Sequence, residues 1–163
     1  MRLYFKERAF SWLDSYAICD KLGNLVYNVK GQLAQGHCLK FYDAAGNEVA
    51  TIQEQIVDKA TNFLMYKGNQ YVGLVKKEQS FLSPTYTIEY GNWQVKGNFA
   101  KLDYMIVDDA FGYVGSVSRT KLEFASHVVV DSDDSHDSMV VLMIAISIYA
   151  ELGSREEVFK GAF

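Results

Sequence analysis

Apolar residues in this chain fall in short runs, many of them alternating with polar residues, and Gly-Asn pairs separate the runs at a nearly constant interval. The pairs occupy 23–24, 46–47, 68–69 and 91–92, and Gly112 continues the series with Tyr113 in place of the asparagine. Glycine reaches positive φ without steric cost and asparagine tolerates it, so each pair suits a tight hairpin turn. A repeated hairpin interval predicts an all-β meander.

The runs between these turns predict twelve strands, because they are short, rich in aromatic and β-branched residues and bounded by turn residues. The expected strands are Arg2–Arg8, Tyr16–Asp20, Leu25–Gly31, His37–Asp43, Glu48–Gln55, Thr61–Lys67, Gln70–Lys77, Thr85–Tyr90, Trp93–Phe99, Asp103–Asp108, Tyr113–Arg119 and Ser126–Asp131.

The second half of the chain repeats the first. Val29-Lys-Gly-Gln-Leu-Ala34 recurs as Val95-Lys-Gly-Asn-Phe-Ala100, and 43–46 resembles 109–112 at the same offset. The segment 10–18 also resembles 81–88. We therefore expect residues 10–67 and 81–131 to be similar six-strand units, with Gly31 matched to Gly97 and Gly46 to Gly112. Closing both units into one barrel would remove the exposed strand edges.

The run Met139–Ala150 breaks the strand pattern, since eleven of its twelve residues are apolar and only Ser147 is not. A helix with no polar face must be surrounded on all sides. From 138 to 152 it spans roughly 22 Å at 1.5 Å per residue, which is short of the roughly 30 Å of a bilayer core. The pattern predicts a mainly β protein: a twelve-stranded antiparallel β-barrel of two similar six-strand halves around a central hydrophobic C-terminal α-helix.

Capping residues flank this helix. Asp134, Ser135 and Asp137 are typical of an N-cap and first turn. Gly153 is expected to end the helix at about residue 152. The segment Ser154–Glu157 is typical of a capping box that opens a short tail helix within 154–163.

Length and composition indicate one folded domain, residues 1–163, with 49% apolar residues, a net charge of −4 and a pI near 5.3. Basic residues are scattered, which argues against nucleic-acid binding. Cys19 and Cys38 lie in apolar runs and are interpreted as buried free thiols. The N-terminus lacks the apolar core of a signal peptide, so a reducing cytoplasm is the expected location and an integral membrane protein is not.

The late apolar helix, its acidic lead-in, the doubled half and the pattern of Phe10-Ser-Trp12, Tyr16-x-Ile18-x-Asp20 and Gly-Asn together resemble the LURP-one-related family of the tubby C-terminal-like superfamily. The resemblance covers Met1 to about Leu152. It implies a twelve-stranded barrel wrapped around a hydrophobic helix. Tubby proteins bind phosphoinositide head groups through basic surface residues, and scramblases of the superfamily act at membranes and respond to calcium. This chain lacks a dense basic cluster, so no lipid-binding residue carries over.

The acidic run Asp131, Asp133, Asp134, His136 and Asp137 is the first candidate site, because closely spaced oxygen ligands suit Ca²⁺. It lacks the glycine and the final glutamate of an EF-hand loop. The alternative, which we favour, is a solvated loop that caps the helix.

Histidines offer a second candidate. His127, His136 and Asp133 could together hold a transition metal, although a strand histidine beside an acidic loop is more often simply hydrogen-bonded. His37 shares no motif with them. The sequence contains no nucleophile elbow, phosphate loop or zinc-protease motif, so we assign no enzyme activity, catalytic residue, cofactor or metal ligand.

Two surface features remain. Four basic residues could gather to meet lipid phosphates, or could be ordinary surface charge that protects strand edges; they are Lys76, Lys77, Arg119 and Lys121. Three aromatic residues could form an apolar patch for a partner, but core packing is favoured; they are Phe10, Trp12 and Phe81. The expected function is a non-catalytic binding module that docks to anionic phospholipid or a protein partner. The alternative is a small-molecule- or metal-dependent, Ca²⁺-responsive activity at the barrel mouth or acidic loop.

Overall fold

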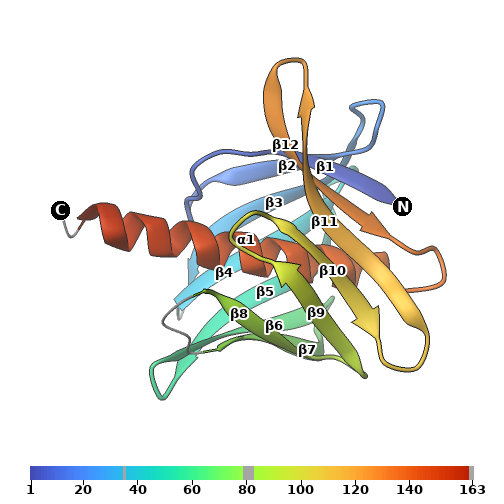
Figure 1. Cartoon of the computed structure of the whole chain (residues 1–163). Coiled ribbons are helices and arrows are strands. Elements are labelled where there is room, and N and C mark those ends of the chain that lie inside the picture. Colours follow the sequence, from blue (N-terminus) through green and yellow to red (C-terminus); the bar gives the residue numbers. More distant parts are fainter. Residues whose placement is uncertain (35, 79–82, 162–163) are drawn as a thin grey trace.

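The computed structural model describes residues 1–34, 36–78 and 83–161, which form a series of strands followed by one long helix (Figure 1). The strands are β1 (Arg2–Lys6), β2 (Ser15–Cys19), β3 (Leu25–Ala34), β4 (Gly36–Asp43), β5 (Glu48–Val57), β6 (Ala60–Lys67), β7 (Gln70–Glu78), β8 (Thr85–Glu89), β9 (Trp93–Asn98), β10 (Asp103–Asp108), β11 (Gly112–Leu122) and β12 (Ala125–Ser132), and the helix is α1 (Ser138–Gly161). The predicted twelve strands are confirmed. The five glycines of the Gly-Asn series have positive φ, from 51° at Gly91 to 88° at Gly46.

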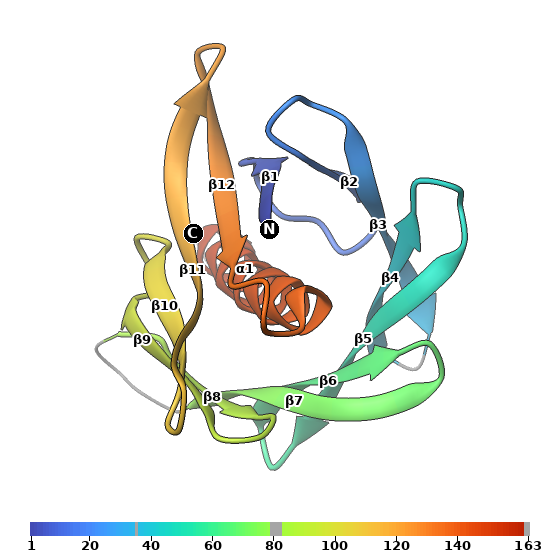
Figure 2. The ribbon, with the colours of Figure 1, turned by 90° about the vertical axis from the view of Figure 1, so that its right-hand side faces the viewer.

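All the strands belong to one antiparallel sheet that curls around α1 (Figure 2). Its order is β8-β7-β6-β5-β4-β3-β2-β1-β12-β11-β10-β9. The first and last strands of the chain pair along their length, from Arg2 opposite Asp131 to Lys6 opposite His127. The two ends of the order, β8 and β9, share no ladder in the described structure. The fold is therefore a nearly closed twelve-stranded antiparallel barrel with one C-terminal helix, as predicted.

The two halves of the barrel repeat each other in strand register. Strands β7 and β8 pair in the register of β1 and β2, although β1 and β2 pair at one position and β7 and β8 at five. Strands β10, β11 and β12 pair as β4, β5 and β6 do. A bulge follows Phe41 in one half and Ile106 in the other. The matched pairs are Tyr4–Cys19 with Leu74–Glu89, Phe41–Ala50 with Ile106–Gly115, and Ile52–Met65 with Val117–Val130. The predicted duplication is confirmed in the register of these strand pairs, although β8 and β9 form no ladder equivalent to that of β2 and β3, and residues 79–82 lie outside the described residues.

The predicted glycine matches are half right. Gly31 and Gly97 are equivalent, because they lie opposite Leu39 and Tyr104, the matched positions of β4 and β10. Gly46 and Gly112 are not equivalent. Asp43 corresponds to Asp108, since the Oδ1 atom of each accepts the backbone N–H two residues later. Gly112 lies four residues after Asp108, and it therefore takes the position of Asn47, which lies four residues after Asp43. The number of residues between equivalent positions of the two halves is therefore smaller from β4 onward than it is in β3. The reason is that the β9–β10 hairpin is shorter than the equivalent β3–β4 hairpin.

Helix α1 fills the barrel. Every residue from Met139 to Ala150 is buried, as the sequence predicted. The Ser147 hydroxyl lies within this buried run. It donates a hydrogen bond to the carbonyl of Met143 at 2.7 Å and is therefore satisfied inside the helix. At the start of the helix Asp137 Oδ1 accepts the backbone N–H of Met139 at 3.0 Å, so Asp137 is the N-cap. Asp134 and Ser135 do not cap the helix.

The helix does not end at Gly153, contrary to prediction, but continues to Gly161. Glycine is required there by packing, because a Cβ at this position would lie 2.3 Å from the Cβ of Phe10. Ser154 is not an N-cap either: its hydroxyl donates to the carbonyl of Ala150 at 2.8 Å and accepts the indole N–H of Trp12 at 2.8 Å. Long-range contacts from the β1–β2 connection thus override a local stop signal.

Candidate functional site

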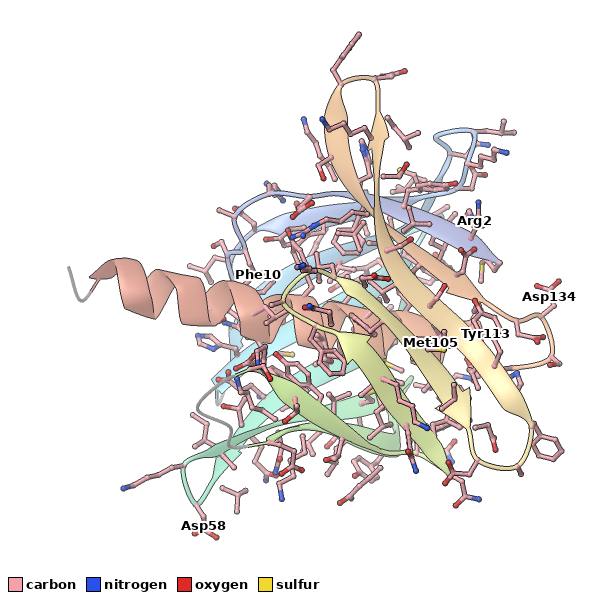
Figure 3. The ribbon with its side chains drawn as sticks, in the orientation of Figure 1. Arg2, Phe10, Asp58, Met105, Tyr113 and Asp134 are labelled. Atoms are coloured by element: carbon pink, nitrogen blue, oxygen red, sulfur yellow. The ribbon has the colours of Figure 1, made fainter. Side chains whose placement is uncertain are left out.

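The acidic segment between β12 and α1 lies at the end of the barrel where the helix begins, as the labelled Asp134 in Figure 3 shows. Asp131 accepts a hydrogen bond from Arg2 Nε at 2.7 Å, and Asp134 pairs with the N-terminal ammonium group at 3.0 Å. Asp133 Oδ1 accepts the backbone N–H and the hydroxyl of Ser135, both at 2.8 Å, and these bonds lower the pKa of Asp133. Each of these carboxylates therefore has a protein partner.

Asp137 is engaged in the same way. Besides capping α1 it forms an ion pair with Lys67 of β6. Across residues 1–34, 36–78 and 83–161, His, Cys, Asp and Glu side chains do not gather in threes as a metal site would need. The favoured interpretation, a loop that caps the helix, is the one that these contacts support.

The three histidines lie apart. His127 Nδ1 is 3.1 Å from the carbonyl of Ala125 in its own strand, at the end of β12 distant from the acidic segment. His136 packs edge-on against Trp93, with ring centroids 5.9 Å apart. His37 stacks on Trp12 at 4.4 Å and lies 2.9 Å from Glu54. The proposed set of His127, His136 and Asp133 is therefore not brought together.

The four basic residues do not gather on one surface. Lys77 points into the barrel, where its ammonium group lies 3.0 Å from Glu151 of α1, while the neighbouring Lys76 faces outward. Arg119 of β11 forms a two-pronged pair with Glu7, at 2.8 and 3.1 Å. Strands β8, β9 and β10 separate β7 from β11 on this side of the barrel. Ordinary charge pairing, the favoured interpretation, agrees with these positions.

Of the three aromatic residues that could form a surface patch, the two that the structure describes do not form one. Phe10 and Trp12 are buried, which confirms the prediction of core packing, and Phe81 lies outside the described residues. Both cysteines are free thiols; Cys38 is buried as predicted, but Cys19 is partly exposed.

A groove that the sequence did not indicate lies between β1 and β2, which pair only at Tyr4 and Cys19 in the described structure. It has a volume of about 400 Å³ and is bounded on one side by the turn after β2 and on the other by the β11–β12 hairpin. Both hairpins project beyond the barrel at the top of Figure 1. The residues that line the groove include Lys6, Lys21, Leu22, Leu122, Glu123 and His127.

The tips of these two hairpins expose large apolar side chains. Leu22 is 86% exposed and Phe124 is fully exposed. The β11–β12 turn consists of Glu123 and Phe124, with φ of 51° and 67°, a conformation that ordinarily favours Asn-Gly. A non-glycine residue there costs roughly 1–2 kcal/mol. The turn therefore holds a phenylalanine in water, in a backbone conformation that Asp58 and Lys59 of the β5–β6 turn share.

Sequence reasoning missed this site because no Gly-Asn pair marks the β11–β12 turn. The only sequence signal was the short segment Leu122-Glu-Phe124 between two expected strands, and this segment is equally typical of a continuing strand. The charges around the tips are mixed. Lys6 and Lys21 are exposed, whereas the Asp20 carboxylate accepts the backbone N–H groups of Leu22 and Asn24, each at 2.9 Å. These hydrogen bonds lower the pKa of Asp20 and compensate part of its charge.

Comparison with known proteins gives a family and a fold. A family model described as LURP-one-related matches residues 1–148. The Bacillus subtilis (strain 168) protein named "Uncharacterized protein YxjI" is 22% identical over 158 residues, covering 96% of this chain and 97% of its own length. The crystal structure of an Arabidopsis thaliana protein aligns with a TM-score of 0.59 at 17% identity, covering 90% of each chain. No described helix has both the length and the apolarity that a membrane span needs.

Proposed function

The chain belongs to the LURP-one-related family, and from that premise we propose that it is a non-catalytic binding module that docks to anionic phospholipid surfaces through its two projecting hairpins. The observation that carries the proposal is the pair of exposed apolar tips, Leu22 and Phe124, on either side of one groove. The family match gives no activity, and the printed name of the Bacillus relative assigns none.

The chemistry of the tips suits a membrane interface. An exposed leucine and phenylalanine each gain roughly 1.5–3 kcal/mol when fully buried in an apolar medium. Lysines near an anionic leaflet contribute about 1 kcal/mol each. Lys21 lies beside Leu22, Lys121 lies in the β11–β12 hairpin three residues before Phe124, and Lys6 lines the groove between the hairpins. Stable peripheral binding needs two such signals together. The overall charge of −4 opposes binding, so we expect the interaction to be weak and sensitive to salt.

We also propose the cytoplasm as the compartment, with the free thiols Cys19 and Cys38 as support. The alternative of a Ca²⁺-responsive activity at the acidic segment has less support, since Asp131, Asp133 and Asp137 already have partners.

Sedimentation with vesicles tests the docking. The protein should pellet with vesicles in which phosphatidylserine is a minor component beside phosphatidylcholine, and much less with pure phosphatidylcholine. Phe124→Asp combined with Leu22→Asp should lower the bound fraction at least tenfold, because both apolar anchors are lost. The matched control is Phe111→Asp, since Phe111 is 80% exposed at the β10–β11 turn, away from the groove.

Three outcomes would contradict this proposal. The first is equal binding to neutral and anionic vesicles. The second is equal loss of binding in the Phe111 and Phe124 variants. The third is binding that requires millimolar Ca²⁺, which would favour the alternative and direct attention to Asp133.

A further inference from the structure

We propose that the groove between the two projecting hairpins binds the head group of phosphatidylserine, a phosphodiester that carries an amino acid with one ammonium and one carboxylate group. The inference rests on the proposed function and deepens it, because it names the lipid that the docking surface selects. It predicts recognition of one head group beyond the attraction that any anionic leaflet exerts on lysines.

The groove lies on the outer face of the sheet. Leu3 and Phe5 of β1 point into the core, so the alternation of the strand turns Tyr4 and Lys6 outward. The β2–β3 and β11–β12 hairpins rise on either side of β1 (Figure 2). The volume of about 400 Å³ lies within the range of about 300–1,000 Å³ typical of ligand sites. A lipid in a leaflet that both tips contact would present its head group to this groove.

Cationic groups line the groove at two places. Lys6 lies directly opposite His127 of β12, which brings the Cβ atoms of the two residues to about 5 Å. The Nδ1 atom of His127 is 3.1 Å from the carbonyl oxygen of Ala125, so a ligand would meet its Nε2 atom. Lys21 lies on the opposite wall, in the β2–β3 turn. One ligand could therefore place an anionic group between Lys6 and His127 and a second one at Lys21.

The two acidic groups of the groove differ in their partners. Asp20 accepts the backbone N–H groups of Leu22 and Asn24, each at 2.9 Å, and the side-chain amide of Asn24 at 3.1 Å. Its charge is thus compensated within the turn. Glu123 and the two lysines of the groove form no ion pair in the part of the chain that the structure describes. The groove therefore offers one carboxylate and two ammonium groups to a ligand.

This charge pattern complements a phosphoserine head group. The ligand's ammonium group can pair with Glu123, while its phosphate and carboxylate groups meet Lys6 and Lys21; charge-assisted hydrogen bonds of this kind are the stronger ones. Phosphatidylglycerol carries the same net charge but has no ammonium group for Glu123. A polyphosphorylated head group would place still more negative charge beside Glu123, and specificity often depends on such repulsion. We therefore expect a preference for phosphatidylserine among lipids of equal charge.

The second half of the barrel supplies a matched control. The β5–β6 turn is equivalent to the β11–β12 turn, because Val57 opposite Ala60 corresponds to Leu122 opposite Ala125. Asp58 therefore takes the position of Glu123, and both residues have positive φ. Asp58→Asn removes a carboxylate from the same kind of turn, outside the groove.

Vesicle sedimentation tests the preference. Phosphatidylcholine vesicles with phosphatidylserine are compared with vesicles that contain phosphatidylglycerol at the same mole fraction, so that surface charge is equal. The phosphatidylserine vesicles should bind about fivefold more tightly, which is the most that one exposed ion pair supplies. Glu123→Gln should abolish this preference and leave binding to phosphatidylglycerol at least as strong, while Asp58→Asn should change neither value.

Soluble probes separate head-group recognition from docking to a bilayer. Dihexanoylphosphatidylserine below its micelle concentration and glycerophosphoserine should both shift the backbone amide resonances of Lys6, Glu123 and His127 in an NMR titration. Glycerophosphoglycerol should shift them less. The lipid should bind more tightly than glycerophosphoserine, because its chains add apolar contact with the hairpin tips. Equal affinity of these two probes would make a soluble phosphodiester the ligand and would overturn the assignment to a lipid.

The remaining outcomes distinguish this inference from the docking proposal. Equal binding to phosphatidylserine and phosphatidylglycerol vesicles would overturn the head-group inference and leave docking through the tips intact. Resonance shifts centred on another surface would have the same meaning. Binding to neither vesicle would contradict the proposed function, and the inference with it.

Discussion

The β2–β3 and β8–β9 hairpins occupy equivalent places in the two halves, yet the first is paired and the second is open in the described structure. Their inner-face tyrosines show the difference. Tyr16 accepts the backbone N–H of Ser11 at 2.9 Å, within its own half. Tyr86 instead donates to Glu151 of α1, which also pairs with Lys77. The two copies of one strand pattern thus differ both in strand pairing and in the groups to which their inner-face tyrosines hydrogen-bond.

The helix is the element that both halves share, so damage to it should have the largest effect. Leu142→Asp would place a carboxylate in a fully buried, apolar site. The cost of several kcal/mol is comparable to the whole stability of a typical domain, so we expect the variant not to fold. The measurement is circular dichroism with thermal melting. The control is Met105→Asp, because Met105 is exposed; similar melting of the two variants would contradict a helix-filled barrel.

The ionic contact at the open half should have the next largest effect. Glu151→Leu leaves the buried Lys77 ammonium without its carboxylate and should cost about 3–5 kcal/mol. Adding Lys77→Met should recover most of that loss, since an apolar pair of similar volume is often neutral. Tyr16→Phe is the comparison in the closed half and should cost about 1 kcal/mol. Urea unfolding measures all of these; if the double variant is no more stable than Glu151→Leu alone, the pair is not the cause.

The equivalent glycines should both resist substitution, for different reasons. A Cβ at Gly31 would lie 1.5 Å from the carbonyl oxygen of Trp12, whereas Gly97 has φ of 141° and a Cβ there would lie 2.5 Å from the carbonyl oxygen of Asp103. We expect Gly31→Ala and Gly97→Ala each to cost about 2–3 kcal/mol, in the upper range for single substitutions. Gly46→Ala is the control, with positive φ but free space, and should cost about 1 kcal/mol. Denaturant unfolding gives the three losses, and a loss at Gly97 no larger than that at Gly46 would show that backbone conformation alone, without the close contact, sets the cost at Gly97.

The smallest effect concerns Glu7, the first-half equivalent of Lys77. Burial raises its pKa, but hydrogen bonds from Ser126 and Arg119 outweigh burial and lower the pKa below its usual 4.5. A carboxyl with a lowered folded pKa stabilises the fold above its unfolded pKa, and this stabilisation is lost as the pH falls through the folded value. Glu7→Gln should therefore cost up to about 1 kcal/mol at neutral pH and nothing in acid below the folded pKa. Urea unfolding across the acid range measures this, and a loss that is independent of pH would assign the effect to packing.

Local pattern determined most of the architecture. Alternation and the Gly-Asn turns predicted all twelve strands, because side-chain period and positive φ are properties of neighbouring residues. The apolar run 139–150 predicted a surrounded helix for the same reason. The sequence alone also showed the duplication, although it matched Gly112 to the wrong turn position, since similarity of short segments does not reveal where a hairpin has become shorter.

Contacts between distant residues decided the rest. Gly153 reads locally as a helix stop, yet Phe10 packs against it and the helix continues. Leu22 and Phe124 are ordinary apolar residues in the sequence, and only the fold places them on two tips beside one groove. Strand pattern is set within a few residues, whereas contacts such as that of Phe10 with Gly153 join residues far apart in the sequence and exist only in the folded chain.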